Sequence, residues 1–283
     1  MKLTARDVSL TGLFLLGAVL TCPRAAQAQH ESFAIYEDWT TSRTIRSDRW
    51  VAVDATSLEV KREVKGHHFL MRTRREGGTA SDVSFAGARH RLTFTNPIAI
   101  DQIEADLKIK DLALSGCATN PAQPSRVITA IFLNKFNDGG GAPGNMTGDH
   151  LVAVNAFRAS NSLDPEGVLR LQGAILRCID AVCSNAFSIP GGVVDLPGTV
   201  LVAEPFTLRV IWDSLNNRFL VGVGDGPDVP IVYPAAANQK PAGVAFADIR
   251  TQLVAANCTS ELTVTDATVA VQQVRTNASA IIP

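Results

Sequence analysis

Four arginines are spaced so that they could act together on an anion. Arg72 and Arg74 are two residues apart in one predicted strand, and Arg89 and Arg91 have the same spacing in another. Alternate side chains of a strand point to the same face. If the two strands are neighbours, the four guanidinium groups share an exposed face that could bind carboxylates or sulfates in a bidentate manner. The pattern favours an ordinary sheet surface, with acidic side chains from other strands interleaved, and anion binding by Arg72, Arg74, Arg89 and Arg91 is the alternative.

A pair of carboxylates, Glu104 and Asp106, projects from one face of a third predicted strand. Retaining hydrolysis of a glycosidic bond uses two carboxyl groups about 5 Å apart. The same two residues also fit the solvated side of an amphipathic strand, because the residues between and beside them are apolar. The pattern favours this second interpretation, with catalysis as the alternative.

The loop 134–149 is rich in hard oxygen ligands. Asp138 and Asp149 lie in it among asparagines and glycines, and such side chains suit calcium. The spacing matches no defined calcium loop, and the same residue types are common in long hairpin connections. We therefore expect no cofactor, with calcium at Asp138 and Asp149 as the alternative. We also expect no apolar residue to anchor this loop.

The first 28 residues predict an export signal, and four cysteines lie after it. An even number of cysteines in an exported chain predicts two disulfides. Proximity favours a bond between Cys178 and Cys183, which leaves Cys117 with Cys258. The second bond would close a loop of about 140 residues and stabilise the fold by up to ~5 kcal/mol on the chain-entropy model. Metal ligation is disfavoured, because no short Cys-x-x-Cys or Cys/His pairing accompanies these residues.

The clearest predicted element is an antiparallel hairpin from Pro205 to Gly226. Phe206, Leu208, Val210 and Trp212 alternate with more polar residues, and this period predicts one buried face. An Asn-Asn turn joins the two strands, since Asn tolerates the positive φ that hairpin turns require. Similar strands recur at short intervals along the chain, with no helix longer than a turn or two. The sequence therefore predicts an all-β sandwich or jelly roll.

The hairpin motif F-x-L-x-V-x-W-D-x-x-x-N-x-F-x-V-x-V-x-D-G resembles a strand pair of the concanavalin A-like lectin/glucanase superfamily. The run EDW followed by IRSDRW resembles the start of many such sandwiches, and its aromatics are expected to cap the core. The resemblance implies a jelly-roll sandwich of two antiparallel sheets and, by analogy of fold, a glycan ligand. Family 16 glycosidases of this superfamily carry Glu-x-Asp-x-x-Glu on a strand. This chain has Glu104 and Asp106, but Lys108 and Ile109 stand where the second glutamate is expected.

The first 28 residues predict an export signal. Lys2 and Arg6 precede a short apolar core at 12–22, and Ala26-Gln27-Ala28 is a small-x-small cleavage site. The apolar core is too short to span a bilayer. Removal of the whole signal, residues 1–28, changes the number of basic residues from 26 to 23 and of acidic residues from 27 to 26, which leaves a net charge of −3. We therefore expect no nucleic-acid partner and no membrane attachment after cleavage.

Residues 29–283 predict a single β-sandwich domain that is secreted or periplasmic. The sequence favours a non-catalytic binding or structural module whose partner is an extracellular or cell-wall polysaccharide, with a preference for acidic chains. The alternative is a carbohydrate-active enzyme of the jelly-roll type, either a glycoside hydrolase or a polysaccharide lyase. A lyase would need a tyrosine or histidine base beside the arginines, and neither Tyr36 nor Tyr233 lies in such a motif.

Overall fold

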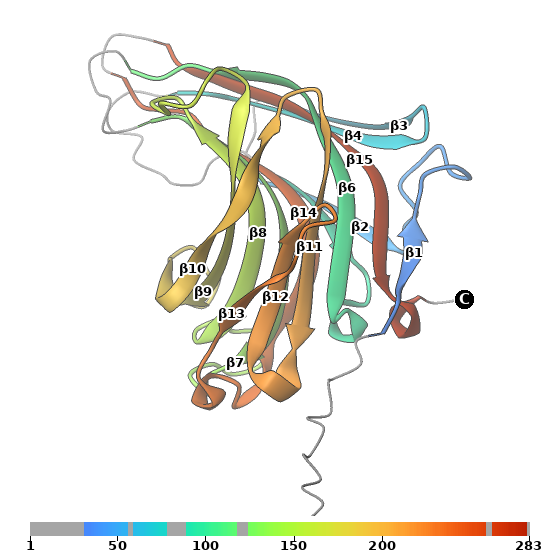
Figure 1. The fold of residues 1–283 in the computed structure, drawn as a ribbon, viewed down its shortest axis with the longest axis vertical. Helices are drawn as coiled ribbons and strands as arrows, with labels where there is room; N and C mark the ends of the chain where they lie inside the picture. Colours follow the sequence, from blue (N-terminus) through green and yellow to red (C-terminus); the bar gives the residue numbers. More distant parts are fainter. Residues whose placement is uncertain (1–30, 56–58, 78–88, 118–123, 259–261, 282–283) are drawn as a thin grey trace, which may run out of the picture.

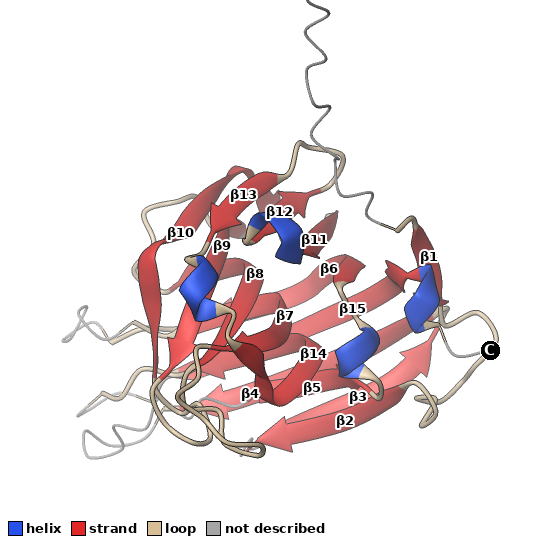
Figure 2. Cartoon of the chain, turned by 90° about the horizontal axis from the view of Figure 1, so that it is seen from below, coloured by secondary structure: helices blue, strands red, loops and turns tan. Residues whose placement is uncertain are grey.

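The computed structural model describes residues 31–55, 59–77, 89–117, 124–258 and 262–281. The predicted export signal, residues 1–28, lies outside these ranges. The described chain folds into two antiparallel sheets that pack face to face, joined by loops and short 3-10 turns (Figures 1 and 2). The predicted all-β sandwich with two antiparallel sheets is confirmed. No helix in these ranges is long and apolar enough to cross a membrane.

The eight-stranded sheet has the order β13-β12-β11-β6-β15-β4-β3, and β1 also pairs with β15. Its strands are β1 Phe33–Glu37, β3 Glu59–Lys65, β4 His68–Glu76, β6 Gln102–Leu114, β11 Pro205–Asp213, β12 Arg218–Val223, β13 Val229–Val232 and β15 Val264–Asn277.

The seven-stranded sheet has the order β10-β9-β8-β7-β14-β5-β2. Its strands are β2 Trp50–Ala55, β5 Arg89–Phe94, β7 Arg126–Asn137, β8 Asp149–Ala159, β9 Val168–Cys178, β10 Ala186–Leu201 and β14 Lys240–Val254. Every pair of neighbouring strands is antiparallel.

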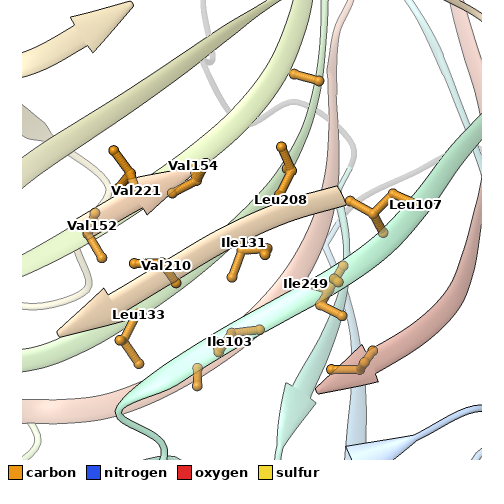
Figure 3. Packing of buried hydrophobic residues seen from close by; sticks show 14 of the residues in the cluster. Ile103, Leu107, Ile131, Leu133, Val152, Val154, Leu208, Val210, Val221 and Ile249 are labelled. Atoms are coloured by element: carbon orange, nitrogen blue, oxygen red, sulfur yellow. The ribbon is translucent and has the colours of Figure 1, made fainter. Parts of the chain in front are cut away.

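The main core lies between the two sheets. Figure 3 shows Ile103 and Val210 from the eight-stranded sheet in the same layer as Ile131, Val152 and Ile249 from the seven-stranded sheet, and all five side chains are fully buried. Because strand side chains alternate, the residues between them point away from this layer. Each sheet therefore has an outer face, and the two outer faces lie on opposite sides of the molecule.

The central hairpin, β11 and β12, forms as the alternation predicts. Leu208 faces Val223 and Val210 faces Val221 across the two strands. Asn217 adopts the predicted positive φ, at 50°. The Asp213 carboxylate accepts a hydrogen bond from the Asn216 backbone N–H and so caps the turn. Trp212 is partly buried against the core, and its Nε1 donates to the Tyr233 hydroxyl at 2.8 Å.

The aromatic residues near the start of the described chain cap one part of the core, as expected. Tyr36, Trp39 and Trp50 are all buried. The rings of Tyr36 and Trp50 meet edge to face with their centroids 5.1 Å apart, and Trp50 also packs against Phe94 at 4.5 Å.

Two sequence expectations about irregular stretches are wrong. The loop 134–149 does have an apolar anchor, because Met146 is buried in a cluster on the outer face of the seven-stranded sheet. The sequence pattern also predicts a strand only from Thr199 to Ala203, whereas the structure has one long strand, β10, over Ala186–Leu201. The pairing of β10 with β9 shifts register at two places, and Gly191 and Gly198, which have positive φ, lie at these shifts. The shifts interrupt the alternation of apolar and polar residues by which a strand is recognised in the sequence.

Candidate functional site

Strand pairing on the outer face of the seven-stranded sheet brings three arginines together. Arg91 of β5 lies directly opposite Arg250 of β14, and Arg89 is opposite Gln252 one step along the same face. Residues on either side of these positions, such as Leu92 and Ile249, are fully buried in the core, so the arginines point away from it. We call Arg89, Arg91 and Arg250 the arginine site.

Arg250 is held in place by a carboxylate and an aromatic ring. Its Nη2 donates to Oδ2 of Asp248 at 2.9 Å. Its guanidinium carbon lies 3.9 Å from the ring centroid of Phe132, a close cation–π contact with the neighbouring strand β7. Arg250 is 8% exposed and Asp248 is fully buried. This arrangement fixes one cation of the site at the surface of a tightly packed cluster.

The other two arginines of the site have no counter-ion in the described chain. Arg89 and Arg91 are partly buried, and neither makes a hydrogen bond or an ion pair with a described residue. Burial lowers the pKa of Arg89, and the charges of Arg250 and Arg91 lower it further. Burial also lowers the pKa of Arg91, where Asp248 opposes the shift and Arg250 adds to it. Three cations thus face one buried carboxylate.

The expectation that Arg72 and Arg74 share this face is wrong. Both belong to β4 in the eight-stranded sheet, whereas Arg89 and Arg91 belong to β5 in the other sheet. The pairs therefore point to opposite sides of the sandwich. Arg72 also has a partner across the sheet, since its Nη2 lies 2.9 Å from Oδ2 of Asp266, and Arg74 lies 3.2 Å from Glu76.

The carboxylate pair Glu104 and Asp106 lies on the outer face of the eight-stranded sheet, within a network of ion pairs. Arg275 contacts Glu104 at 2.6 Å and Asp106 at 3.0 Å. Arg209 contacts Glu104 at 3.3 Å, and the Thr207 hydroxyl donates to Asp106 at 2.7 Å. These contacts use the carboxylates to tie β6 to its neighbours β11 and β15.

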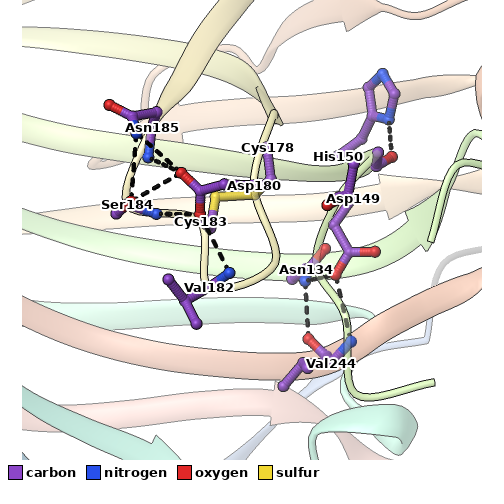
Figure 4. Close-up of a disulfide and its surroundings, with 12 residues drawn as sticks. Asn134, Asp149, His150, Cys178, Asp180, Val182, Cys183, Ser184, Asn185 and Val244 are labelled. Carbon is purple, nitrogen blue, oxygen red and sulfur yellow. Dashed lines mark hydrogen bonds between the residues drawn. A yellow bond between two sulfur atoms is a disulfide. The ribbon is translucent and has the colours of Figure 1, made fainter. Parts of the chain in front are cut away.

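The proposed calcium ligands are occupied by nitrogen donors. Both oxygens of the buried Asp149 accept hydrogen bonds, from the side-chain amide of Asn137 at 2.6 Å and the backbone N–H of Gly243 at 2.7 Å on one side. The side-chain amide of Asn134 donates to the other oxygen at 2.8 Å (Figure 4). Asp138 is bound by the Arg177 guanidinium at 2.5 Å. The described residues contain no group of three or more His, Cys, Asp or Glu side chains suited to a metal ion.

Both disulfides join the cysteines as predicted. Cys117 and Cys258 have Cα atoms 5.6 Å apart, and those of Cys178 and Cys183 are 4.9 Å apart. Figure 4 shows how the Asp180 carboxylate organises the short loop between Cys178 and Cys183, accepting hydrogen bonds from the loop residues that follow it. Cys178 and Cys183 pack in the same outer cluster as Phe132. The disulfide therefore belongs to the same outer cluster as the ring on which Arg250 lies.

Arg250, Asp248 and Phe132 were not predicted from the sequence. The stretch 248–253 does alternate charged or polar residues with Ile249, Thr251 and Leu253, which is a local signal for a strand with one outer face. That signal does not reveal which strand lies alongside. The site becomes visible when the pairing of β14 with β5 and β7 is known.

Comparison with known proteins gives a likeness of overall shape. No protein-family model matches the sequence, and no curated protein matches it. Similar solved structures include a kappa-carrageenase from Zobellia galactanivorans, at 10% identity and a TM-score of 0.48, with 88% of this chain and 96% of that chain covered. A putative beta-glucanase from Mycobacterium abscessus has 11% identity and a TM-score of 0.47, with 86% and 99% covered.

A third similar structure is an alginate lyase, a mutant of Aly36B in complex with an alginate trisaccharide, at 9% identity and a TM-score of 0.43, with 87% of this chain and 97% of that chain covered. Because the identities are low and the TM-scores lie below 0.5, the activities of these three proteins are not carried over to this chain.

Proposed function

We propose that this protein is a secreted module that binds an acidic polysaccharide on the outer face of its seven-stranded sheet. The observation that carries the proposal is the arginine site, where Arg91 faces Arg250 directly and neither Arg89 nor Arg91 has a counter-ion among the described residues. Like charges directly opposite each other across a sheet are destabilising. A bound anion would remove that repulsion, because it would contact both cations at once.

The chemistry of the arginine site suits carboxylates and sulfates. A guanidinium group presents a planar fork of N–H donors that matches either anion in a bidentate manner. Partial burial strengthens such contacts, because the effective dielectric constant is lower than in bulk water. The contacts with Phe132 and Asp248 already hold the Arg250 guanidinium in place, so this donor loses little freedom on binding.

The surroundings of the site favour a local anion over a nucleic acid. The chain after residue 28 has a net charge of −3, so its attraction for anions is confined to a patch and does not extend over the molecule. The two disulfides fit an oxidising compartment outside the cytoplasm, where acidic polysaccharides occur. The predicted export signal supports the same location.

A lyase or hydrolase acting on the same polysaccharide is the second candidate, and the buried carboxylate Asp248 beside the arginine site is the observation that favours it. A lyase needs a base next to the bound sugar. His90 lies between Arg89 and Arg91 in the chain, but its side chain points into the core and is fully buried. A binding module therefore accounts for the described residues with fewer assumptions.

The test is binding of polygalacturonate, with neutral β-glucan as the comparison, at low ionic strength. Replacing Arg89 and Arg91 together with Gln should weaken polygalacturonate binding by at least about tenfold, because each charged hydrogen bond contributes about 1.5–3 kcal/mol. The matched control replaces Arg72 and Arg74 with Gln, which changes the net charge equally on the opposite face and should leave binding intact. Equal binding of both glycans would contradict the proposal.

The same incubation distinguishes binding from catalysis. If the chain length of the polygalacturonate is unchanged after prolonged incubation, the binding module is supported. If the chains shorten, and the double Arg89 and Arg91 variant no longer shortens them, the enzyme is supported at the same site. Added salt should weaken binding in either case, since exposed charges are screened.

A further inference from the structure

A row of side chains crosses the seven-stranded sheet from the arginine site to the far side. It begins at Arg89 on β5 and continues through cross-strand neighbours Gln252, Ile128, Phe157 and Arg170 on β14, β7, β8 and β9. All are on the outer face, and each is at least partly exposed. Neighbouring strands lie about 4.8 Å apart, so the four steps from β5 to β9 span roughly 19 Å.

Two amide side chains that make no side-chain hydrogen bond with a described residue lie on or beside this row. Gln252 is part of it, and Asn155 lies in the adjacent row, which runs from Arg91 and Arg250 through Ala130. Neither amide makes a side-chain hydrogen bond within the described chain, and both are partly exposed. An amide both donates and accepts hydrogen bonds, which matches the hydroxyl groups of a sugar.

The far end of the row is a cleft of about 280 Å³ lined by Phe157, Leu163 and Arg170, which we call the Phe157 cleft. Leu163 is 99% exposed, although the turn that carries it is well ordered by Arg158, whose guanidinium donates to three backbone carbonyls of residues 164–168. Arg170 is neutralised there by a bidentate contact with Asp164. This end therefore offers an apolar surface beside two arginines that are already engaged, Arg170 by Asp164 and Arg158 by backbone carbonyls.

We infer that the ligand is an extended chain of sugars that lies across the strands, with an anionic group on the arginine site and the apolar face of a more distant sugar in the Phe157 cleft. This inference rests on the proposed function and adds a length requirement to it. A span of roughly 19 Å corresponds to about four hexose units. A single charged sugar can occupy the arginine site, but it cannot reach Leu163.

The test uses oligogalacturonates of one to eight units and measures the dissociation constant of each by calorimetry. For the unaltered protein, affinity should rise with length up to about four units and then level off. Leu163→Ser should weaken binding of the tetramer by about tenfold, because burial of a leucine side chain is worth about 1.5 kcal/mol or more. The same change should leave binding of the dimer as it was.

The matched control is Leu215→Ser, which alters a leucine of similar exposure, 79%, in the turn of the central hairpin in the other sheet. Because both leucines are exposed, neither substitution should unfold the protein. Phe157→Ala provides a second variant of the Phe157 cleft.

The possible results separate the inference from the proposed function. If the dimer binds and the tetramer binds no tighter, or if Leu163→Ser and Phe157→Ala leave the tetramer unaffected, the length requirement is wrong while the arginine site remains supported. The proposed function predicts that the variant with both Arg89 and Arg91 replaced by Gln binds neither the dimer nor the tetramer. If no oligomer binds the unaltered protein at low salt, both are overturned.

Discussion

Arg91 of β5 lies directly opposite Arg250 of β14 on the outer face of the seven-stranded sheet, and the next pair along, Leu92 and Ile249, meets on the inner face. Leu92 and Ile249 are both fully buried. Shifting either strand by one residue would turn its own member of this pair, Leu92 or Ile249, onto the outer face. Packing inside the sandwich therefore fixes the alignment that places two cations side by side outside it.

Replacing Arg91 with Gln should not weaken the unliganded protein. Removal of a like-charge neighbour of Arg250 should raise the free energy of unfolding by about 0.5 kcal/mol at low ionic strength, and less in high salt. Urea unfolding at two salt concentrations measures the change. Arg74→Gln, which gives up a contact with Glu76, is the control and should show no gain. A loss above about 1 kcal/mol for Arg91→Gln would mean that this side chain stabilises the fold.

Trp212 should contribute to stability through its ring and its indole N–H. Trp212→Ala should lower the free energy of unfolding by about 3 kcal/mol, because a large aromatic side chain is removed from a packed site beside Phe136. Trp212→Phe keeps a ring but loses the hydrogen bond to Tyr233, and should cost about 1 kcal/mol. Denaturant unfolding of both variants checks the order. Equal losses would show that the ring contributes nothing beyond its hydrogen bond.

The two disulfides should differ in their contribution to stability. Cys117 and Cys258 are 141 residues apart, whereas Cys178 and Cys183 are separated by five. On the chain-entropy model, replacing the first pair with alanine costs about 5 kcal/mol and replacing the second about 2 kcal/mol. Thermal unfolding of the two double variants provides the comparison. A larger loss for the short loop would point to native contacts around Asp180 as the main source of its stabilisation.

Asp213 should make stability depend on pH in the acidic range. Burial alone would raise the pKa of its carboxyl, but hydrogen bonds from Asn216 and the charge of Arg218 hold it below the ordinary value of 3.8. A carboxyl with a lowered folded-state pKa stabilises the protein fully above its unfolded value, and this stabilisation is lost as pH falls through the folded value. The difference in unfolding free energy between the native protein and Asp213→Asn should thus be about 2 kcal/mol at pH 7 and shrink below pH ~3.8. A difference that stays constant from pH 7 to pH 2 would argue against an ionised Asp213.

The alternation of apolar and polar residues was enough to predict the fold class and the β11–β12 hairpin, because this period can be recognised within a few consecutive residues. The pairing of distant strands is not local. Arg72 and Arg89 lie on consecutive strands, yet the chain passes from one sheet to the other between them. The partner of Glu104 on β15, Arg275, is 171 residues away in the sequence. The sequence could therefore suggest an arginine cluster, but not that Arg250 completes it.

The disulfides were easier to predict, since four cysteines allow three pairings and two of the cysteines are close in sequence. Asp149 was harder, because the same carboxylate suits a calcium ion or a set of N–H donors. The donors that decide between these, such as Asn134 and Gly243, come from other strands.

The bond between Cys117 and Cys258 affects what happens when a protease cuts the chain. Every strand from β7 to β14 lies between the two bridged positions. A single cut within that span, such as one at the exposed turn that carries Leu163, breaks the polypeptide and leaves its two fragments covalently joined. The severed ends also stay in place, because the strands on either side remain hydrogen-bonded to their neighbours. A nicked copy of this protein would therefore migrate as one species on a denaturing gel until its disulfides are reduced.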